Sequence, residues 1–427
     1  MFKKILSSEL GKGTLILFIM LGIFNLLNFA FHFTMARILE PAEYGTLAVL
    51  ISITYIYGVP TEAIQNIISK YTIKFNIKRQ YGKIKFLMFK SLKKGFKISF
   101  FIFVVLFFLA FGISYILNIN FWLIFLANFI IFGAFLTPIV LGVLQGRKKF
   151  FSLGGAMVFE ASFKMIFSVS LVIFGFGVYG ALGGILMGII SGIVFSLYFN
   201  KDIIKEKEVE TNFNKIYIQG LPYFFVVLVI ILFFSVDIIL AKVFFLDELA
   251  GQYAVLSMIG KMIFLGTFAV SKAMFPLTSE KSENNENPKE LFKKSILIIT
   301  SICLISIIIL ALFPKLIISI LYGKQYLEMS KYLVYSGVAF SLLALSNLML
   351  VYGLSLRNLK NTHYLFLIFG LEIILLLFFH SNILEYIIVI MVSNTIMFIG
   401  TFFILVKWKA SASLSQHTMK KKELKRL

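Results

Sequence analysis

The chain has 427 residues, is 59% hydrophobic and only 14% charged, and contains 50 phenylalanines. This balance excludes an ordinary water-soluble globular domain and indicates that lipid is the solvent for most of the chain. The formal net charge is +21, which by itself would also suit a nucleic-acid-binding protein, so the positions of the basic residues decide its meaning.

Apolar runs recur along the whole chain, and each is long enough to cross roughly 30 Å of hydrocarbon as a helix. Helices are expected because an open sheet edge would leave backbone groups unpaired in lipid. The first run has a basic start but no obvious small-residue cleavage site, so we expect it to be retained. The runs predict twelve spans, at 13–36, 45–69, 97–117, 121–145, 152–175, 177–199, 216–241, 250–278, 295–314, 332–355, 364–381 and 384–406.

Most of the 41 Lys and Arg residues fall on one side of this twelve-span arrangement, the side that also holds both termini. The positive-inside rule therefore predicts a multi-pass protein of the cell membrane with cytoplasmic ends. The longest segment between spans, 70–96, is interpreted as a basic cytoplasmic loop. We attribute the charge to topology and to affinity for anionic membrane lipids, and not to nucleic acid. Cys303 is the only cysteine, which excludes an intrachain disulfide.

A polar stretch at 200–215 divides the chain into halves, and we predict lobes at 1–205 and 206–427. YGTLAVLIS, starting at Tyr44, aligns with AGQYAVLSM, starting at Ala250, so that Gly45 matches Gly251. Both stretches join an odd-numbered span to the next even-numbered span, which favours a parallel duplication. The alternative is coincidence in a chain rich in Ala, Val and Leu.

Four segments resemble one family in order along the chain: ARILEPAEYGTLAVLISI (36–53), LQGRKKF (144–150), DIILAKVFFLDELAGQYAVLSMIGK (237–261) and PKLIISILYGKQY (314–326). They resemble the Wzx-type polysaccharide flippases of the multidrug/oligosaccharidyl-lipid/polysaccharide exporter superfamily. The resemblance implies two six-helix lobes around a central cavity that opens alternately to either side. It also implies a cargo, an oligosaccharide on a polyprenyl phosphate or pyrophosphate, which passes from the cytoplasmic to the outer leaflet. The implied partners are membrane lipids and enzymes of polysaccharide biosynthesis.

Charged side chains within the spans are the best candidates for a site, because each costs about 3 kcal/mol to insert. Glu160 and Lys164 lie one helical turn apart, as a self-neutralising pair or as a cavity pair from which Lys164 moves to a lipid phosphate. Lys261 lies near the middle of its span. A flexible ammonium clamps a mobile phosphate weakly, so we expect Lys164 and Lys261 to contact the headgroup. Arg37 and Lys242 lie nearer the outer mouth, where helix-end anchoring is the alternative.

Isolated carboxylates are the candidates for coupling. Burial disfavours the charged form of a carboxyl group, so Glu62 or Glu372 could exchange a proton. Gln65 and Asn66 follow Glu62 and would line a cavity wall. Asp237 lies in a family-like stretch and could serve coupling, cap a helix or pair with Lys242 in water. We expect no cofactor beyond a coupling proton or sodium ion, and no metal site or catalytic residue.

Two other functions are weighed against the flippase interpretation. A multidrug cation antiporter of the same superfamily would share the fold but would favour a carboxylate-rich cavity over lysines. A membrane glycosyltransferase or polymerase would need a sizeable catalytic loop, and the outer loops are short. No phosphate-binding glycine loop is present, which argues against an ATP-driven pump.

Overall fold

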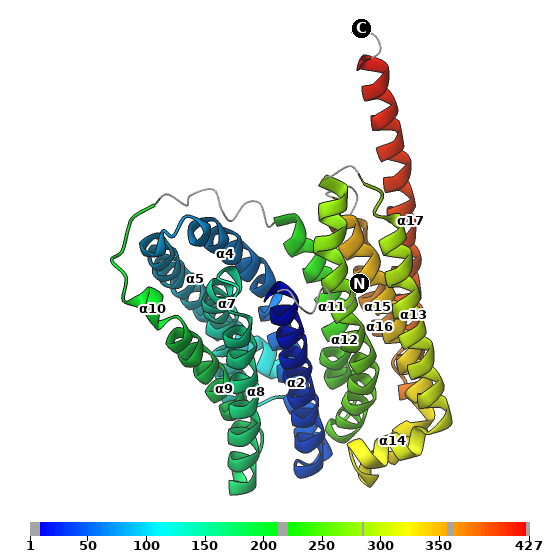
Figure 1. The fold of residues 1–427 in the computed structure, drawn as a ribbon. Coiled ribbons are helices and arrows are strands. Elements are labelled where there is room, and N and C mark those ends of the chain that lie inside the picture. Colours follow the sequence, from blue (N-terminus) through cyan, green and yellow to red (C-terminus); the bar gives the residue numbers. More distant parts are fainter. Residues whose placement is uncertain (1–8, 212–220, 284–285, 357–362, 424–427) are drawn as a thin grey trace. The chain divides into compact units, whose positions relative to one another are not determined.

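A computed structural model describes residues 9–211, 221–283, 286–356 and 363–423. Within these ranges the chain is built of helices and contains no strand (Figure 1). The all-α fold class predicted from the sequence is therefore confirmed. A helix satisfies its backbone hydrogen bonds within one segment, which is what a chain surrounded by lipid requires.

The first half contains α2 (Glu9–Ile38), α3 (Pro41–Tyr57), α4 (Val59–Ile77), α5 (Tyr81–Leu117), α6 (Phe121–Asn128), α7 (Ile130–Gly146), α8 (Phe150–Leu171), α9 (Gly177–Phe199) and α10 (Lys201–Ile204). The second contains α11 (Leu221–Phe244), α12 (Asp247–Glu283), α13 (Lys289–Leu312), α14 (Pro314–Leu321), α15 (Leu333–Ser355), α16 (His363–Phe378) and α17 (Ile383–Glu423). A π-helical turn, Val172–Phe176, joins α8 to α9, and a 3-10 helix, Lys324–Tyr332, precedes α15.

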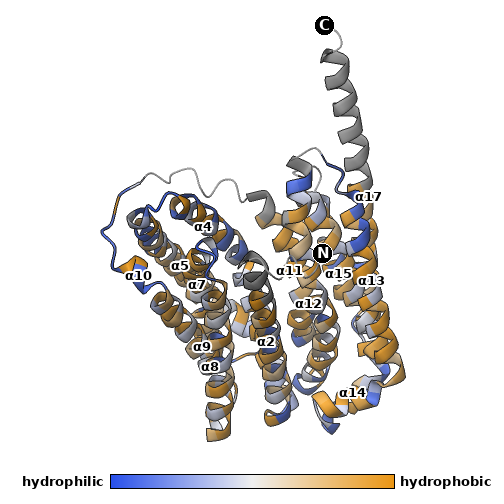
Figure 2. Cartoon of the chain, in the orientation of Figure 1, coloured by the Kyte–Doolittle hydropathy of each residue, from blue (hydrophilic) through white to orange (hydrophobic). Residues whose placement is uncertain are grey.

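Ten helical segments in the described ranges are long and apolar enough to cross a membrane. One of them, Phe150–Phe199, holds two helices, because the chain reverses at Gly175 and Gly177. Both glycines have positive φ, 89° and 48°, which other residues rarely adopt. The shorter apolar helix Tyr364–Phe378 completes the twelve predicted spans. Figure 2 shows apolar residues along these helices and polar residues in the segment around α10.

The prediction of a loop over 70–96 is wrong. Helix α4 continues to Ile77 and α5 begins at Tyr81, so that a break of three residues, 78–80, separates them. Arg79 turns the chain there with φ of 53°. Lysine is a good helix former, so a run of lysines marks where the membrane ends but not where a helix ends.

The helices pack into two compact units. The first comprises Met1–Phe224 and Ala241–Gly251, and the second comprises Phe225–Leu240 and Gln252–Leu427. The division predicted at 205/206 falls in the polar stretch before α11. In the structure, packing changes from one unit to the other twice within α11 and once within α12, so each of these helices contributes to both units.

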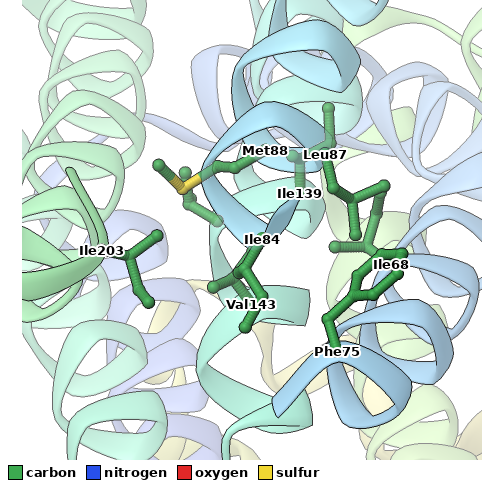
Figure 3. Close-up of a cluster of buried hydrophobic side chains, with 9 residues drawn as sticks. Ile68, Phe75, Ile84, Leu87, Met88, Ile139, Val143 and Ile203 are labelled. Atoms are coloured by element: carbon green, nitrogen blue, oxygen red, sulfur yellow. The ribbon is translucent and has the colours of Figure 1, made fainter. Parts of the chain in front are cut away.

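The core of the first unit includes a cluster of apolar side chains from four helices (Figure 3). Ile68 and Phe75 come from α4, and Ile84 with its neighbours comes from α5. Helix α7 adds Ile139 and Val143, while α10 contributes Ile203. The close packing of these side chains holds the four helices together.

A stripe of glycines packs α9 against α8. Gly184, Gly188 and Gly192 follow one another at intervals of four and therefore share one face of α9. A Cβ atom on Gly184 would lie 2.2 Å from the backbone nitrogen of Ser168, and one on Gly188 would lie 2.7 Å from Cβ of Lys164. Small residues at this spacing let helix backbones approach closely in lipid.

Helix α15 is the central helix of the second unit, and most of its residues are buried. Its Ser336 hydroxyl donates to the carbonyl of Leu256 on α12 over 2.8 Å. A Cβ atom on Gly260 would lie 2.4 Å from the Phe340 ring, so the glycine allows α12 and α15 to meet. This close contact places the next residue of α12, Lys261, in the interior of the unit.

The two stretches aligned in the sequence touch one another. A Cβ atom on Gly45 would lie 2.7 Å from Cα of Gly251, and a Cβ atom on Gly251 would lie 1.8 Å from the carbonyl oxygen of Pro41. All three residues belong to the first compact unit. Both aligned glycines are thus required by the same close helix contact.

Candidate functional site

Lys164 lies on α8 and reaches across to α2. Its Nζ atom donates to Oδ1 of Asn28 and stands 4.6 Å from the centre of the Phe31 ring. The Asn28 amide in turn donates to the carbonyl of Phe24 over 2.8 Å, which fixes the direction of its oxygen. The ammonium is thus half-buried and held by one neutral acceptor and one aromatic face.

Glu160 lies one turn away from Lys164 and interacts with it electrostatically. Among the described residues, however, no direct ion pair joins the two side chains, because the ammonium bonds to Asn28 instead. Gly192 faces the Glu160 side chain, and a Cβ atom there would lie 2.8 Å from Oε2. The sequence predicted an ion pair between Glu160 and Lys164, but in the structure the Lys164 ammonium is not bonded to a carboxylate.

The polar residues of α4 do not act as a group. The Gln65 amide donates to Oε1 of Gln145 on α7 over 2.8 Å, which ties the two helices together. Glu62 is half-buried, whereas Asn66 is exposed on another face of the helix. Gln65 therefore has a clear packing role, and Glu62 remains the coupling candidate of this helix.

The second unit contains a buried ion pair between neighbouring helices. Nζ of Lys261 on α12 lies 2.8 Å from Oδ1 of Asp237 on α11, and both side chains are 0% exposed. The ammonium also stands 5.0 Å from the Phe234 ring and 5.5 Å from the Phe340 ring. Two aromatic faces and one carboxylate thus replace the water that this cation has lost.

Hydroxyl groups satisfy the remaining oxygens of Asp237. Tyr253 donates to Oδ2 over 3.1 Å, and Ser257 donates to the same oxygen. Tyr386 of α17 donates to the Asp237 backbone carbonyl over 2.7 Å. Such bonds reduce the cost of burying a charge, so Asp237 is firmly held within the unit.

Glu372 on α16 lies beside this pair and is 0% exposed. It interacts electrostatically with both Asp237 and Lys261, and with Tyr253 and Tyr386. Within the described part of the chain neither carboxylate oxygen has a hydrogen-bond partner. A buried, unbonded carboxylate is costly, so the group is expected to carry a proton or to exchange bonds with its neighbours.

The two outer candidates differ in their surroundings. Lys242, at the end of α11, is buried, and its Nζ atom lies 2.6 Å from Oδ1 of Asp247 on α12. This ion pair links the two helices across the turn between them. Arg37, at the end of α2, is exposed. Asp237 pairs with Lys261, so the predicted alternative of a pair with Lys242 is wrong.

The LQGRKKF segment has a structural role. Arg147 donates to Asp202 over 2.9 Å through Nη1, and Lys149 donates to the same carboxylate over 3.1 Å. Arg147 also bonds to the buried Asn200, whose amide reaches the Val140 carbonyl over 3.3 Å. The hydrogen bond from Arg147 holds the pKa of the Asp202 carboxyl well below its usual value. These bonds join the end of α7 to α10 and to Asn200, which follows α9.

Several contributing residues were missed in the sequence. Asn28 looked like one polar residue in an apolar run, and the hydroxyls of Tyr253, Ser257 and Tyr386 carry no pattern that points to Asp237. The glycine stripe could have been predicted, since GILMGIISG at 184–192 repeats glycine at intervals of four, a pattern typical of close helix packing in membranes. No group of three or more His, Cys, Asp or Glu in the described ranges could hold a metal ion.

Comparison with solved structures identifies the class of fold. An inward-facing MATE-family multidrug resistance transporter of the MOP superfamily matches with a TM-score of 0.72 and 14% identity, over 91% of this chain and 96% of that one. The lipid II flippase MurJ in an inward closed conformation matches with a TM-score of 0.69 and 14% identity, over 96% and 93%. The protein therefore has the helical fold of MATE and MurJ, and the two-lobe prediction is consistent with it.

Residues 34–331 match the family model described as polysaccharide biosynthesis protein, which covers most of the chain. The protein belongs to this polysaccharide biosynthesis family. No curated protein sequence matches the chain significantly. The family predicted from the four sequence segments is confirmed, as is its assignment to a membrane transport fold.

Proposed function

We propose that the protein is a flippase that moves an oligosaccharide linked to a polyprenyl phosphate or pyrophosphate from the cytoplasmic to the outer leaflet by alternating access. The observation that carries this proposal is the match to a polysaccharide biosynthesis family on a transporter fold. The similarity in fold to a lipid II flippase supports a cargo that is a lipid carrying sugar. We expect enzymes that build and extend the same lipid-linked sugar to be its partners.

The headgroup contact is proposed for Lys164. Its ammonium is half-buried, and its bonded acceptor is the neutral Asn28, so an incoming phosphate gains a cation without breaking an ion pair. Lys261 could take the same role only by leaving Asp237, because it is fully buried and bonded to that carboxylate. Arg37 and Lys242 are proposed as weaker contacts near the outer mouth.

Coupling is proposed for Glu372, with a proton as the coupled ion. Movement of Lys261 from Asp237 towards Glu372 would exchange one buried pair for another and release the proton from Glu372. Proton release during transport in vesicles, lost in Glu372→Gln with cargo binding retained, would support this role. Unchanged proton release in that variant would contradict it.

We also propose that the protein resides in the plasma membrane with both termini in the cytoplasm. The lysine-rich ends of α4 and α5 and the basic residues after Leu405 would then face the same compartment. A fluorescent protein that matures only in the cytoplasm should be bright at the carboxyl terminus and dark when fused after Asn118. The reverse pattern would overturn the orientation.

Depletion in the native host tests the main proposal. After depletion, polyprenyl-linked oligosaccharide should accumulate, with leaflet-selective labelling placing it on the cytoplasmic side, and surface polysaccharide should fall. Unchanged lipid-linked sugars together with increased sensitivity to cationic drugs would instead identify a multidrug exporter. Accumulation of unextended sugars on the outer leaflet would point to a polymerase.

A further inference from the structure

The first unit contains an apolar pocket that the transport proposal does not use. It has a volume of about 180 Å³ and lies between α4, α5 and α7, and Phe224 of α11 also lines it. Ile64 and Ile67 line one side, Phe135 and Ile139 line another, and Ile98 and Lys94 belong to α5. Its lining is almost entirely apolar, and Lys94 is the one ionisable side chain among the described lining residues.

The walls of the pocket are well supported. Ile139 is 2% exposed and belongs to the apolar cluster of Figure 3, against which Ile64 also packs. Gly95, next to Lys94, brings α5 close to α7, since a Cβ atom there would lie 3.1 Å from Cδ1 of Ile139. The position of Lys94 relative to the pocket is therefore set by helix packing.

The sequence of α5 sets the depth of this pocket in the membrane. From Ile98 to Leu117 the helix has no charged residue, and a helix of about 20 residues crosses roughly 30 Å of hydrocarbon. Before Ile98 the helix carries Lys90, Lys93, Lys94 and Lys97. Lys94 thus lies at the level of the lipid headgroups, and the apolar lining lies just inside the hydrocarbon.

We propose that this pocket binds an anionic phospholipid, with one acyl chain between α4 and α7 and the phosphate at Lys94. The apolar pocket can hold an acyl chain, and Lys94 at headgroup level can bind the negatively charged phosphate of the same lipid. The pocket is smaller than the roughly 300–1,000 Å³ that encloses a drug-sized ligand, so it suits a segment of chain and not a whole compact molecule. The neighbouring lysines favour an anionic over a zwitterionic headgroup.

Native mass spectrometry of the purified full-length protein, equilibrated with phosphatidylglycerol and phosphatidylcholine, tests the proposal. Lys94→Gln should lower the preference for phosphatidylglycerol about fivefold, the effect of one lysine near an anionic surface. Lys93→Gln is the matched control, because Lys93 is the exposed neighbour that does not line the pocket. Ala63→Phe, which fills the pocket, should remove one bound lipid.

Equal losses of preference in Lys94→Gln and Lys93→Gln would overturn the proposal, because the charge effect would then be diffuse. Retention of the lipid in a folded Ala63→Phe protein would also overturn it, as would displacement of phosphatidylglycerol by equimolar undecaprenyl phosphate, which would assign the pocket to the cargo. If Ala63→Phe fails to fold, the comparison of Lys94→Gln with Lys93→Gln still tests the proposal. The readout is lipid binding, so it is independent of the transport proposal.

Discussion

The half-buried ammonium of Lys164 and the fully buried ammonium of Lys261 are chemically alike but have different surroundings. Lys164 has a neutral acceptor, Asn28, whereas Lys261 has a carboxylate, Asp237. Removing Lys164 leaves no directly bonded carboxylate behind, whereas removing Lys261 leaves the fully buried Asp237. The two lysines, which the sequence placed together as headgroup contacts, should therefore respond differently to substitution.

Lys164→Ala should reduce transport about tenfold or more, the factor expected when a hydrogen bond to a charged group is lost. Protein level and membrane insertion should change little, because the side chain bonded to Lys164 is the neutral Asn28. Flipping by purified protein in vesicles, with thermal stability measured in parallel, checks this. Lys272→Ala is the control, since that exposed span lysine stands over its own helix neighbour Phe268 at 4.7 Å. Normal transport by Lys164→Ala would exclude the headgroup role.

Lys261→Ala should destabilise the protein by about 3–5 kcal/mol, because it leaves the Asp237 carboxylate buried without its cation. The double variant Asp237→Ala with Lys261→Ala should be more stable than Lys261→Ala alone, since both charges are removed together. Unfolding of the detergent-solubilised protein measures Lys261→Ala, the double variant and the single variant Asp237→Ala. Additive losses in the double variant would show that the pair contributes no coupling. In that case loss of transport in Lys261→Ala would support a direct cargo contact.

Asp202 predicts a pH dependence outside the membrane spans. Its folded-state pKa lies below the unfolded value, so its contribution is fully present above the unfolded pKa and is lost as pH falls through the folded pKa. The carboxylate is 48% exposed, so solvent screening should limit the contribution to about 1 kcal/mol or less. Stability measured from neutral pH down to pH 3 should therefore fall less in Asp202→Asn than in the natural chain. Parallel curves would contradict the prediction.

At the scale of helices, small residues decide which faces meet. The glycine stripe of α9 packs against α8, the helix that holds Lys164 and Glu160. Gly260 in the same way lets α12, the helix that holds Lys261, pack against α15. Each candidate charge is therefore held where two helix backbones approach closely. Helix contacts in lipid depend on such packing because the apolar solvent offers little hydrophobic driving force between helices.

Gly184→Ala should destabilise the α8–α9 pair by about 1–3 kcal/mol, the usual cost of overpacking a close contact. A Cβ atom at this position would lie 2.2 Å from the Ser168 backbone nitrogen, which cannot move easily. Gly183→Ala is the matched control, because its nearest atom, Cδ1 of Leu171, lies at an ordinary 3.4 Å. Folded yield and thermal stability in detergent measure both. Equal stability of the two variants would show that α8 and α9 can separate without cost.

At the scale of the whole molecule, the two glycines aligned in the sequence meet in one contact. Gly45 and Gly251 lie together, and Gly251 approaches the Pro41 carbonyl so closely that any side chain would overlap it. The alignment required no knowledge of this contact, and the duplication itself stays a prediction. The position of residues 241–251 in the first unit follows from this contact.

Gly251→Ala should therefore destabilise the protein by about 1–3 kcal/mol, because the Cβ atom would lie 1.8 Å from backbone and not from a flexible side chain. Gly266→Ala is the control in the same helix, since no atom lies within 4 Å of its Cβ position. Replacing Gly by Ala within an open part of a helix should stabilise it slightly. Thermal unfolding of both variants in the same detergent is the measurement. A Gly251→Ala protein as stable as Gly266→Ala would show that the contact is not maintained in solution.

The sequence alone was enough to predict that lipid surrounds most of the chain, how many helical spans cross it, and to which family the protein belongs. These properties depend on local quantities, namely the length of apolar runs, the distribution of basic residues and short motifs in order along the chain. The prediction of a loop at 70–96 was wrong because it used such a local quantity. A run of basic residues indicates where the membrane ends but does not indicate the backbone conformation.

Tertiary structure alone decided which charges meet. Lys164 bonds to Asn28 on α2 although Glu160 is nearer in sequence, and Lys261 bonds to Asp237 on another helix. Glu372 joins the second cluster from α16, far along the chain. These contacts depend on how each helix is rotated about its axis, and that rotation is set by the glycines and large side chains of its neighbours and not by the helix's own pattern.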